Sequence, residues 1–154
     1  MGSFTNASTS GNVDGSNERL ITTNPKVMVN GDVIFTCVGD VLIINLESEC
    51  KSANDATATT IQYQSVPTTG GTVAISGVSS SLASLAAGAS VTLDGSSLAA
   101  APIVSTTGAS LAQTARGIQV PDGTIKLVVA VGSTTGTWRH YLRYKPLEAG
   151  AYVQ

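Results

Sequence analysis

The residues that could carry acid–base, nucleophilic or metal chemistry are few in this chain and far apart. The sequence has one histidine, His140, and two cysteines, Cys37 and Cys50. A Ser-His-Asp triad would have to use His140, but no serine stands in the Gly-x-Ser-x-Gly context of a nucleophile elbow. A zinc site would need the histidine, the cysteines and a carboxylate to converge, and their spacing matches no zinc motif. We therefore expect no catalytic residue, no metal ligand and no cofactor, and we expect that the protein is not an enzyme.

The carboxylates lack the grouping of a catalytic pair or a cation site. Glu47 and Glu49 alternate along one expected strand, so both lie on the same side of it. A glycosidase instead holds its two carboxylates on opposite sides of the sugar. No loop clusters carboxylates at calcium spacing. Four aspartates stand in turn contexts, where the side chain caps local backbone groups: Asp40, Asp55, Asp94 and Asp122.

One stretch, TWRHYLRYKP at 137–146, is chemically much richer than the rest of the chain. It holds the single tryptophan, the single histidine, two of the four tyrosines and three of the eight Lys and Arg residues. Because side chains alternate along a strand, its residues divide into two faces. One face is apolar or amphipathic and suits a core: Trp138, His140, Leu142 and Tyr144. The other is basic and carries a tyrosine: Arg139, Tyr141, Arg143 and Lys145.

The basic face of this strand has three interpretations. It could be a solvated strand surface, a platform on which nucleic-acid bases stack, or a contact with acidic groups of a partner subunit. Arg and Tyr are enriched at protein interfaces, which favours the last over the second. We name Arg139, Tyr141, Arg143 and Lys145 as candidate interface residues. His140, on the other face, is expected to be a packed core histidine.

The elements that would position these residues are strands. Runs rich in β-branched residues and bounded by Gly, Asn, Asp or Pro occur at 26–30, 33–38, 41–52, 57–66, 72–76, 90–95, 101–108, 124–132 and 137–146. Residues 77–90 favour either one short helical turn or an ordered loop. About eight short strands at regular spacing with almost no helix predict an all-β protein. We expect an antiparallel β-sandwich, of jelly-roll type.

The two cysteines are expected to be reduced and buried. If the turn at Gly39-Asp40 closed a hairpin, Cys37 would face roughly Leu42, and Cys50 would lie too far along the other strand to form a disulfide. Reduced thiols suit a protein made in a reducing cytoplasm.

The composition indicates a neutral, hydroxyl-rich surface. Charged residues make up 12% of the 154 residues, about half the usual ~25%. The net charge of −2 gives no overall field that would attract the chain to nucleic acid or to an anionic membrane. We therefore expect no direct nucleic-acid partner and no membrane.

The N-terminal region differs from the rest of the chain. Residues 1–25 are expected to form a flexible polar arm, and residues 26–154 a single β-sandwich domain. The first twenty residues have no apolar segment of the kind that a secretion signal needs. They bury too little apolar surface to order alone, so the arm either stays flexible or orders on a neighbouring subunit.

Residues 128–152, which include VAVGSTTGTWRHYLRYKPLEAGAY, resemble the C-terminal end of small virion structural proteins of tailed bacteriophages. The charge-poor body with a polar arm is also similar to that group, which includes capsid decoration and cement proteins. The resemblance implies a compact β domain on the outside of the head, made in the host cytoplasm. It implies two partners, the major capsid protein and further copies of the chain in a dimer or trimer. It brings no catalytic residues. The alternative is a carbohydrate-binding or adhesive β domain of a phage fibre or cell surface.

Overall fold

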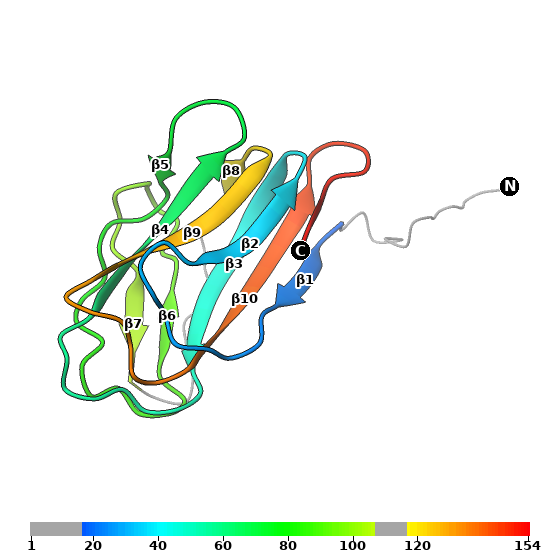
Figure 1. Ribbon diagram of the computed structural model, residues 1–154. Coiled ribbons are helices and arrows are strands. Elements are labelled where there is room, and N and C mark those ends of the chain that lie inside the picture. Colours follow the sequence, from blue (N-terminus) through cyan, green and yellow to red (C-terminus); the bar gives the residue numbers. More distant parts are fainter. Residues whose placement is uncertain (1–16, 107–116) are drawn as a thin grey trace, which may run out of the picture.

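The computed structural model describes residues 17–106 and 117–154, and they form two antiparallel sheets packed face to face (Figure 1). The first sheet has the order β1-β10-β3-β6-β7, with β8 also paired to β3: β1 (Arg19–Thr22), β10 (Trp138–Pro146), β3 (Val41–Cys50), β6 (Ser90–Thr92), β7 (Ile103–Ser105) and β8 (Ile118–Val120). The second has the order β11-β2-β9-β4-β5: β11 (Tyr152–Val153), β2 (Val33–Val38), β9 (Gly123–Ala130), β4 (Thr60–Pro67) and β5 (Val73–Ala74). The described residues contain no helix. The predicted antiparallel β-sandwich is confirmed.

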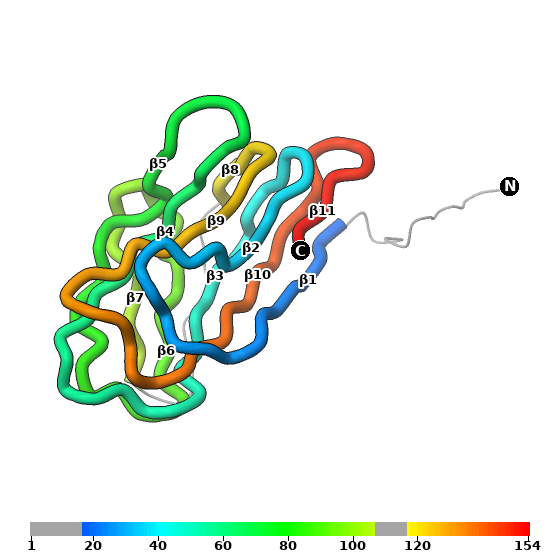
Figure 2. Tube along the Cα trace, in the orientation of Figure 1, coloured from blue at the N-terminus to red at the C-terminus, as the bar shows by residue number. Residues whose placement is uncertain are grey.

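The order of the strands is that of a jelly roll. Without β7, β8 and β11, eight strands follow one another along the chain. The first, eighth, third and sixth of them make one sheet, and the second, seventh, fourth and fifth make the other. This double Greek-key arrangement is the jelly-roll order. Strands β7 and β11 extend its edges (Figure 2), whereas β8 pairs with the beginning of β3, on the side where β6 pairs with the end of that strand.

The turn at Gly39-Asp40 does not close a hairpin, because β2 and β3 lie in different sheets. It is the corner at which the chain passes from one sheet to the other. The strand expected at 26–30 is also wrong. Only Lys26 makes a β-bridge there, to Trp138, while Met28 is buried and its N–H donates to Thr134 Oγ1 at 2.8 Å. Turn residues mark where the chain reverses, and distant pairing decides which strand it then joins.

The core lies between the inner faces of the two sheets, where apolar side chains alternate with outward ones. In β9 and β10 nearly every second residue is buried. The largest fully buried side chains include Trp138, Leu142 and Leu46 from the first sheet and Phe35 and Tyr63 from the second. Both cysteines are buried and free, as the sequence predicts.

A β-bulge in β3 explains why Ile43 and Leu46, which are three residues apart, both face the core. The pairing with β10 shifts between Arg143 and Tyr144, so Ile44 is left without a partner. Before the bulge Ile43 points into the core, and after it Leu46 does, while Ile44 is half-buried. The bulge therefore keeps both halves of the strand aligned with one apolar face.

The segment between β5 and β6 is an ordered loop, which is one of the two expected forms. Leu82 and Leu85 are buried in the core although no helix forms. Asn54 holds this loop: its backbone N–H donates to Leu85 O at 2.9 Å, and its Nδ2 donates to Leu82 O at 3.0 Å.

The N-terminal boundary lies earlier than the sequence suggests. Residues 19–22, expected within the arm, form β1 and pair with β10 over four residues. Ile21 also packs against the core, so this part of the chain gains enough contact to order. Residues 1–16 of the expected arm lie outside the described residues.

Replacing Val131 by Asn is expected to stabilise the protein by about 1 kcal/mol, because a β-branched residue is strained at positive φ and Asn is not. Val131 follows β9 with a φ of 73° and is 71% exposed, so the substitution removes little packing. The measurement is the free energy of unfolding in urea. Val73→Asn is the control, because Val73 is 47% exposed but lies in β5 at an ordinary φ. An unchanged or lower stability for Val131→Asn would contradict the strain.

Candidate functional site

The two faces of β10 lie as the alternation predicts. Trp138, His140, Leu142 and Tyr144 are buried, at 4% exposure or less. The four candidate interface residues alternate with them and point away from the core, on the outer face of the first sheet: Arg139, Tyr141, Arg143 and Lys145.

Two of the candidate interface residues already have acidic partners within their own chain. Tyr141 Oη donates to Glu49 Oε2 at 2.6 Å, and Arg143 Nη2 donates to Glu18 Oε1 at 2.5 Å. Glu49 also pairs with Lys51 at 2.9 Å. The hydrogen bond from Tyr141 is the main cause that lowers the pKa of Glu49. The outer face is therefore mixed in charge. We call it the charged face: Arg139, Tyr141, Arg143 and Lys145 of β10 with Glu47 and Glu49 of β3.

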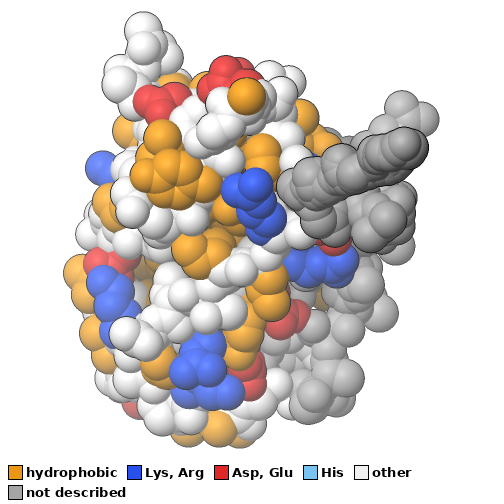
Figure 3. Space-filling model, turned by 90° about the vertical axis from the view of Figure 1, so that its right-hand side faces the viewer, with side chains coloured by type: hydrophobic (Ala, Val, Ile, Leu, Met, Phe, Trp, Pro, Cys, Tyr) orange, Lys and Arg blue, Asp and Glu red, His pale blue; other side chains and the backbone are white. Residues whose placement is uncertain are grey.

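Basic side chains form no continuous surface on the side of the molecule drawn in Figure 3. Hydrophobic and uncharged side chains separate the Lys and Arg side chains there, and acidic ones lie close to several of them. Nucleic-acid backbones are bound by grooves lined with positive charge. This view therefore offers no support for the nucleic-acid interpretation.

His140 is part of a buried chain of hydrogen bonds between the sheets. It is 2% exposed, and its Nδ1 lies 2.7 Å from Ser48 Oγ. Ser48 Oγ lies in turn 2.7 Å from Tyr63 Oη, which reaches Val91 O at 3.4 Å. Burial lowers the pKa of His140 to about 4, so the imidazole is neutral near pH 7. The prediction of a hydrogen-bonded core histidine is confirmed.

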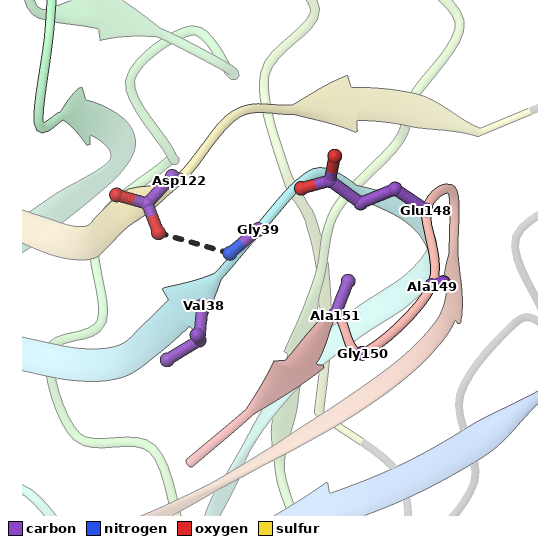
Figure 4. Close-up of a pocket in the computed structure, with 7 residues that line it drawn as sticks. All are labelled: Val38, Gly39, Asp122, Glu148, Ala149, Gly150 and Ala151. Atoms are coloured by element: carbon purple, nitrogen blue, oxygen red, sulfur yellow. Dashed lines mark hydrogen bonds between the residues drawn. The ribbon is translucent and has the colours of Figure 1, made fainter.

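A shallow hollow of about 330 Å³ lies where the Gly39-Asp40 corner meets the loop before β11 (Figure 4). Its lining residues come from three parts of the chain: Val38, Gly39, Asp122, Glu148, Ala149, Gly150 and Ala151. Asp122 Oδ1 accepts a hydrogen bond from Gly39 N at 2.9 Å, and Glu148 Oε1 accepts one from Asp40 N at 3.0 Å. Two carboxylates thus cap consecutive backbone N–H groups.

The hollow is better suited to holding the corner than to catalysis. Asp122 Oδ2 also accepts from Thr68 Oγ1 at 2.6 Å, and this hydrogen bond is the first cause that lowers the pKa of Asp122. Gly39 has a φ of 79°, and a Cβ atom there would lie 2.6 Å from Glu148 Oε1. The two carboxylates therefore cap backbone and hydroxyl donors and hold the Gly39-Asp40 corner against the neighbouring loops.

Within residues 17–106 and 117–154, no three His, Cys, Asp or Glu side chains lie close enough together to hold a metal ion. The same residues include no helix that could cross a membrane.

No family model, curated protein or solved structure matches this chain.

The acidic half of the charged face was not identified from the sequence. The sequence predicts that Glu47 and Glu49 share one side of a strand. It does not predict that this strand pairs with the strand of Arg139, as it does in the structure. The sequence likewise does not predict the hydrogen bonds that connect His140 to Ser48 and Ser48 to Tyr63. The available signal was the polar Ser48 among the buried residues of β3, yet its partners come from distant strands.

Proposed function

We propose that the protein is a non-enzymatic virion component of a tailed bacteriophage, a capsid decoration or cement protein. It would bind the outside of the head and stabilise contacts between major capsid protein subunits. It would act there as a homo-oligomer, on the capsid surface, after synthesis in the host cytoplasm. The jelly-roll fold agrees with this role but does not select it, because the fold also serves unrelated functions.

The observation that carries the proposal is the outer face of the second sheet, which we call the neutral face. Its residues alternate with buried ones along β2, β4 and β9, or are paired with such outward residues from β5 and β11. They are Thr36, Val38, Thr60, Gln62, Gln64, Val66, Ala74, Thr124, Lys126, Val128 and Tyr152. Among these residues Lys126 alone is charged. Hydroxyl, amide and methyl groups can be buried against another protein with little loss of charge hydration. The neutral face is the surface we assign to contact with the capsid.

Charge placed on the neutral face is expected to weaken capsid binding about tenfold or more, because an unpaired charge would be desolvated in the contact. The experiment adds purified chain to heads of the encoding phage that lack it and measures cosedimentation. The test variant is Gln64→Lys with Val128→Lys. The matched control is Leu98→Lys, at a residue that is 48% exposed in the loop before β7 of the other sheet.

Three outcomes would contradict parts of the proposal. If the wild-type chain does not bind heads, the cement role fails. If the double variant binds as well as the wild type, the assignment of the neutral face fails. Binding to a glycan array without binding to heads would favour the adhesive alternative. Removing residues 1–16 leaves β1 in place and tests the arm separately.

A further inference from the structure

The charged face has a pattern that can recognise a second copy of itself. Basic side chains follow β10, and acidic ones follow the adjacent β3. The register places Arg139 beside Glu49 and Tyr141 beside Glu47. Because neighbouring strands are about 4.8 Å apart, a positive row lies next to a negative row along the sheet.

This pattern restricts the partner. An acidic surface would be repelled by Glu47 and Glu49, and a basic surface by Arg139, Arg143 and Lys145. A matching surface must carry the same two rows in the opposite order. A second copy of the chain supplies that order when it is turned about a two-fold axis that runs parallel to the strands, between β10 and β3.

We propose that the protein forms a symmetric dimer in which two charged faces stack, with β10 of each copy over β3 of the other. Arg139 of the second copy then lies over Glu49, and its Tyr141 lies over Glu47. A two-fold axis across the strands would instead place each basic row over its own kind. The charge pattern therefore selects one orientation, in which the strands of the two sheets are roughly aligned, as in packed β-sandwiches.

The side chains of the charged face are mostly half-exposed and partly held in place, and Arg139 Nε is buried. The Arg143 side chain is 50% exposed and that of Glu49 is 28% exposed. The 2.6 Å hydrogen bond from Tyr141 holds the carboxylate of Glu49 before any partner arrives. Preorganised side chains lose less conformational entropy when an interface forms. Exposed ion pairs are also cheap to rearrange, since each contributes little on its own.

The proposed dimer extends the proposed function, and its role in bridging capsid subunits rests on that function. Stacking the two charged faces leaves a neutral face on each outer side of the dimer. If these faces bind capsid subunits, one dimer bridges two subunits, and the two contacts reinforce each other through effective concentration.

The experiment uses the purified full chain without heads, so its failure is distinguishable from failure of capsid binding. Sedimentation velocity is expected to show a dimer that weakens about tenfold or more in either of two variants, Glu47→Lys with Glu49→Lys or Arg139→Glu with Arg143→Glu. An equimolar mixture of the two is expected to recover a heterodimer by native mass spectrometry. Lys126→Glu on the neutral face is the matched control, and circular dichroism checks that every variant is folded.

Each outcome decides the proposal. Loss of the dimer in both variants, with recovery in their mixture, supports it. A monomeric wild type overturns it, as does a dimer that survives both reversals. If folded variants lose the dimer but the mixture does not restore it, the charge rows do not face each other, and the proposed orientation is wrong. A Lys126→Glu variant that alone becomes monomeric would place the dimer contact on the neutral face.

Discussion

Gly136→Ala is expected to destabilise the protein by about 3 kcal/mol or more, because a Cβ atom has no space at this position. It would lie 2.0 Å from Ser52 O and 2.6 Å from Asn54 Oδ1. The backbone N–H of Gly136 also donates to Asn54 Oδ1 at 2.9 Å, and the same oxygen accepts from Trp138 Nε1 at 3.3 Å. Moving the loop away from Gly136 would therefore disturb the start of β10 as well as the turn.

The measurement for this prediction is urea unfolding followed by tryptophan fluorescence, which reports on Trp138 directly. Gly71→Ala is the matched control, because a Cβ atom at Gly71 would meet nothing within 4 Å and its φ is not positive. The control is expected to change stability by less than about 0.5 kcal/mol. If Gly136→Ala unfolds at the same urea concentration as the wild type, the close packing of this turn is not as described.

Acid is expected to destabilise the protein through His140, by about 2 kcal/mol between pH 7 and pH 5 and about 3 kcal/mol by pH 4. The pKa of His140 is about 4 in the folded chain, against the ordinary value of 6.5. Between these values the unfolded chain binds the proton more readily, so the free energy of unfolding falls as the pH is lowered. Above about pH 7 the effect vanishes, because the histidine is neutral in both states. The free energy of unfolding at a series of pH values measures this slope.

Two substitutions distinguish the contribution of His140 to the pH dependence from that of its hydrogen-bond partners. His140→Gln is neutral at every pH, so its stability is expected to change little between pH 7 and pH 5. Tyr63→Phe removes the hydroxyl that hydrogen-bonds to Ser48 but keeps His140. The pH slope of the unfolding free energy is therefore expected to persist, at lower overall stability. Carboxylates such as Glu49, whose pKa is lowered in the folded chain, lose their contribution only at more acidic pH. An equal slope in His140→Gln and wild type between pH 7 and pH 5 would assign the acid sensitivity to other groups.

The two outer faces of the sandwich have different proposed roles, one in self-association and the other in binding the capsid. The charged face has acids and bases in adjacent rows and suits recognition of an identical copy. The neutral face has a single charge, on Lys126, and suits contact with a different and uncharged protein surface. The stretch with the richest chemistry in the sequence, residues 137–146, thus contributes a core face with His140 and a candidate assembly face.

Several features of the fold could be predicted from local pattern. Alternation in β10 assigned the correct residues to the core, and the frequent turn residues indicated a sandwich of short strands. The burial of His140 followed from its apolar neighbours on the same strand face, and that of Cys37 and Cys50 from the usual burial of free cysteines. These predictions succeeded because side-chain direction in a strand depends on position along the strand alone.

Pairing between distant strands could not be predicted from the sequence. Nothing local indicated that the Gly39-Asp40 turn joins two sheets, or that residues 19–22 pair with β10. The same limit applied to the site, since Glu49 meets Tyr141 across 92 residues of chain. By itself the sequence determined which side chains of residues 137–146 point inward and which outward, and it limited the chemistry to very few groups. Only the tertiary structure decided which rows of side chains lie next to each other, because β3 and β10 become neighbours through long-range hydrogen bonds that no local pattern specifies.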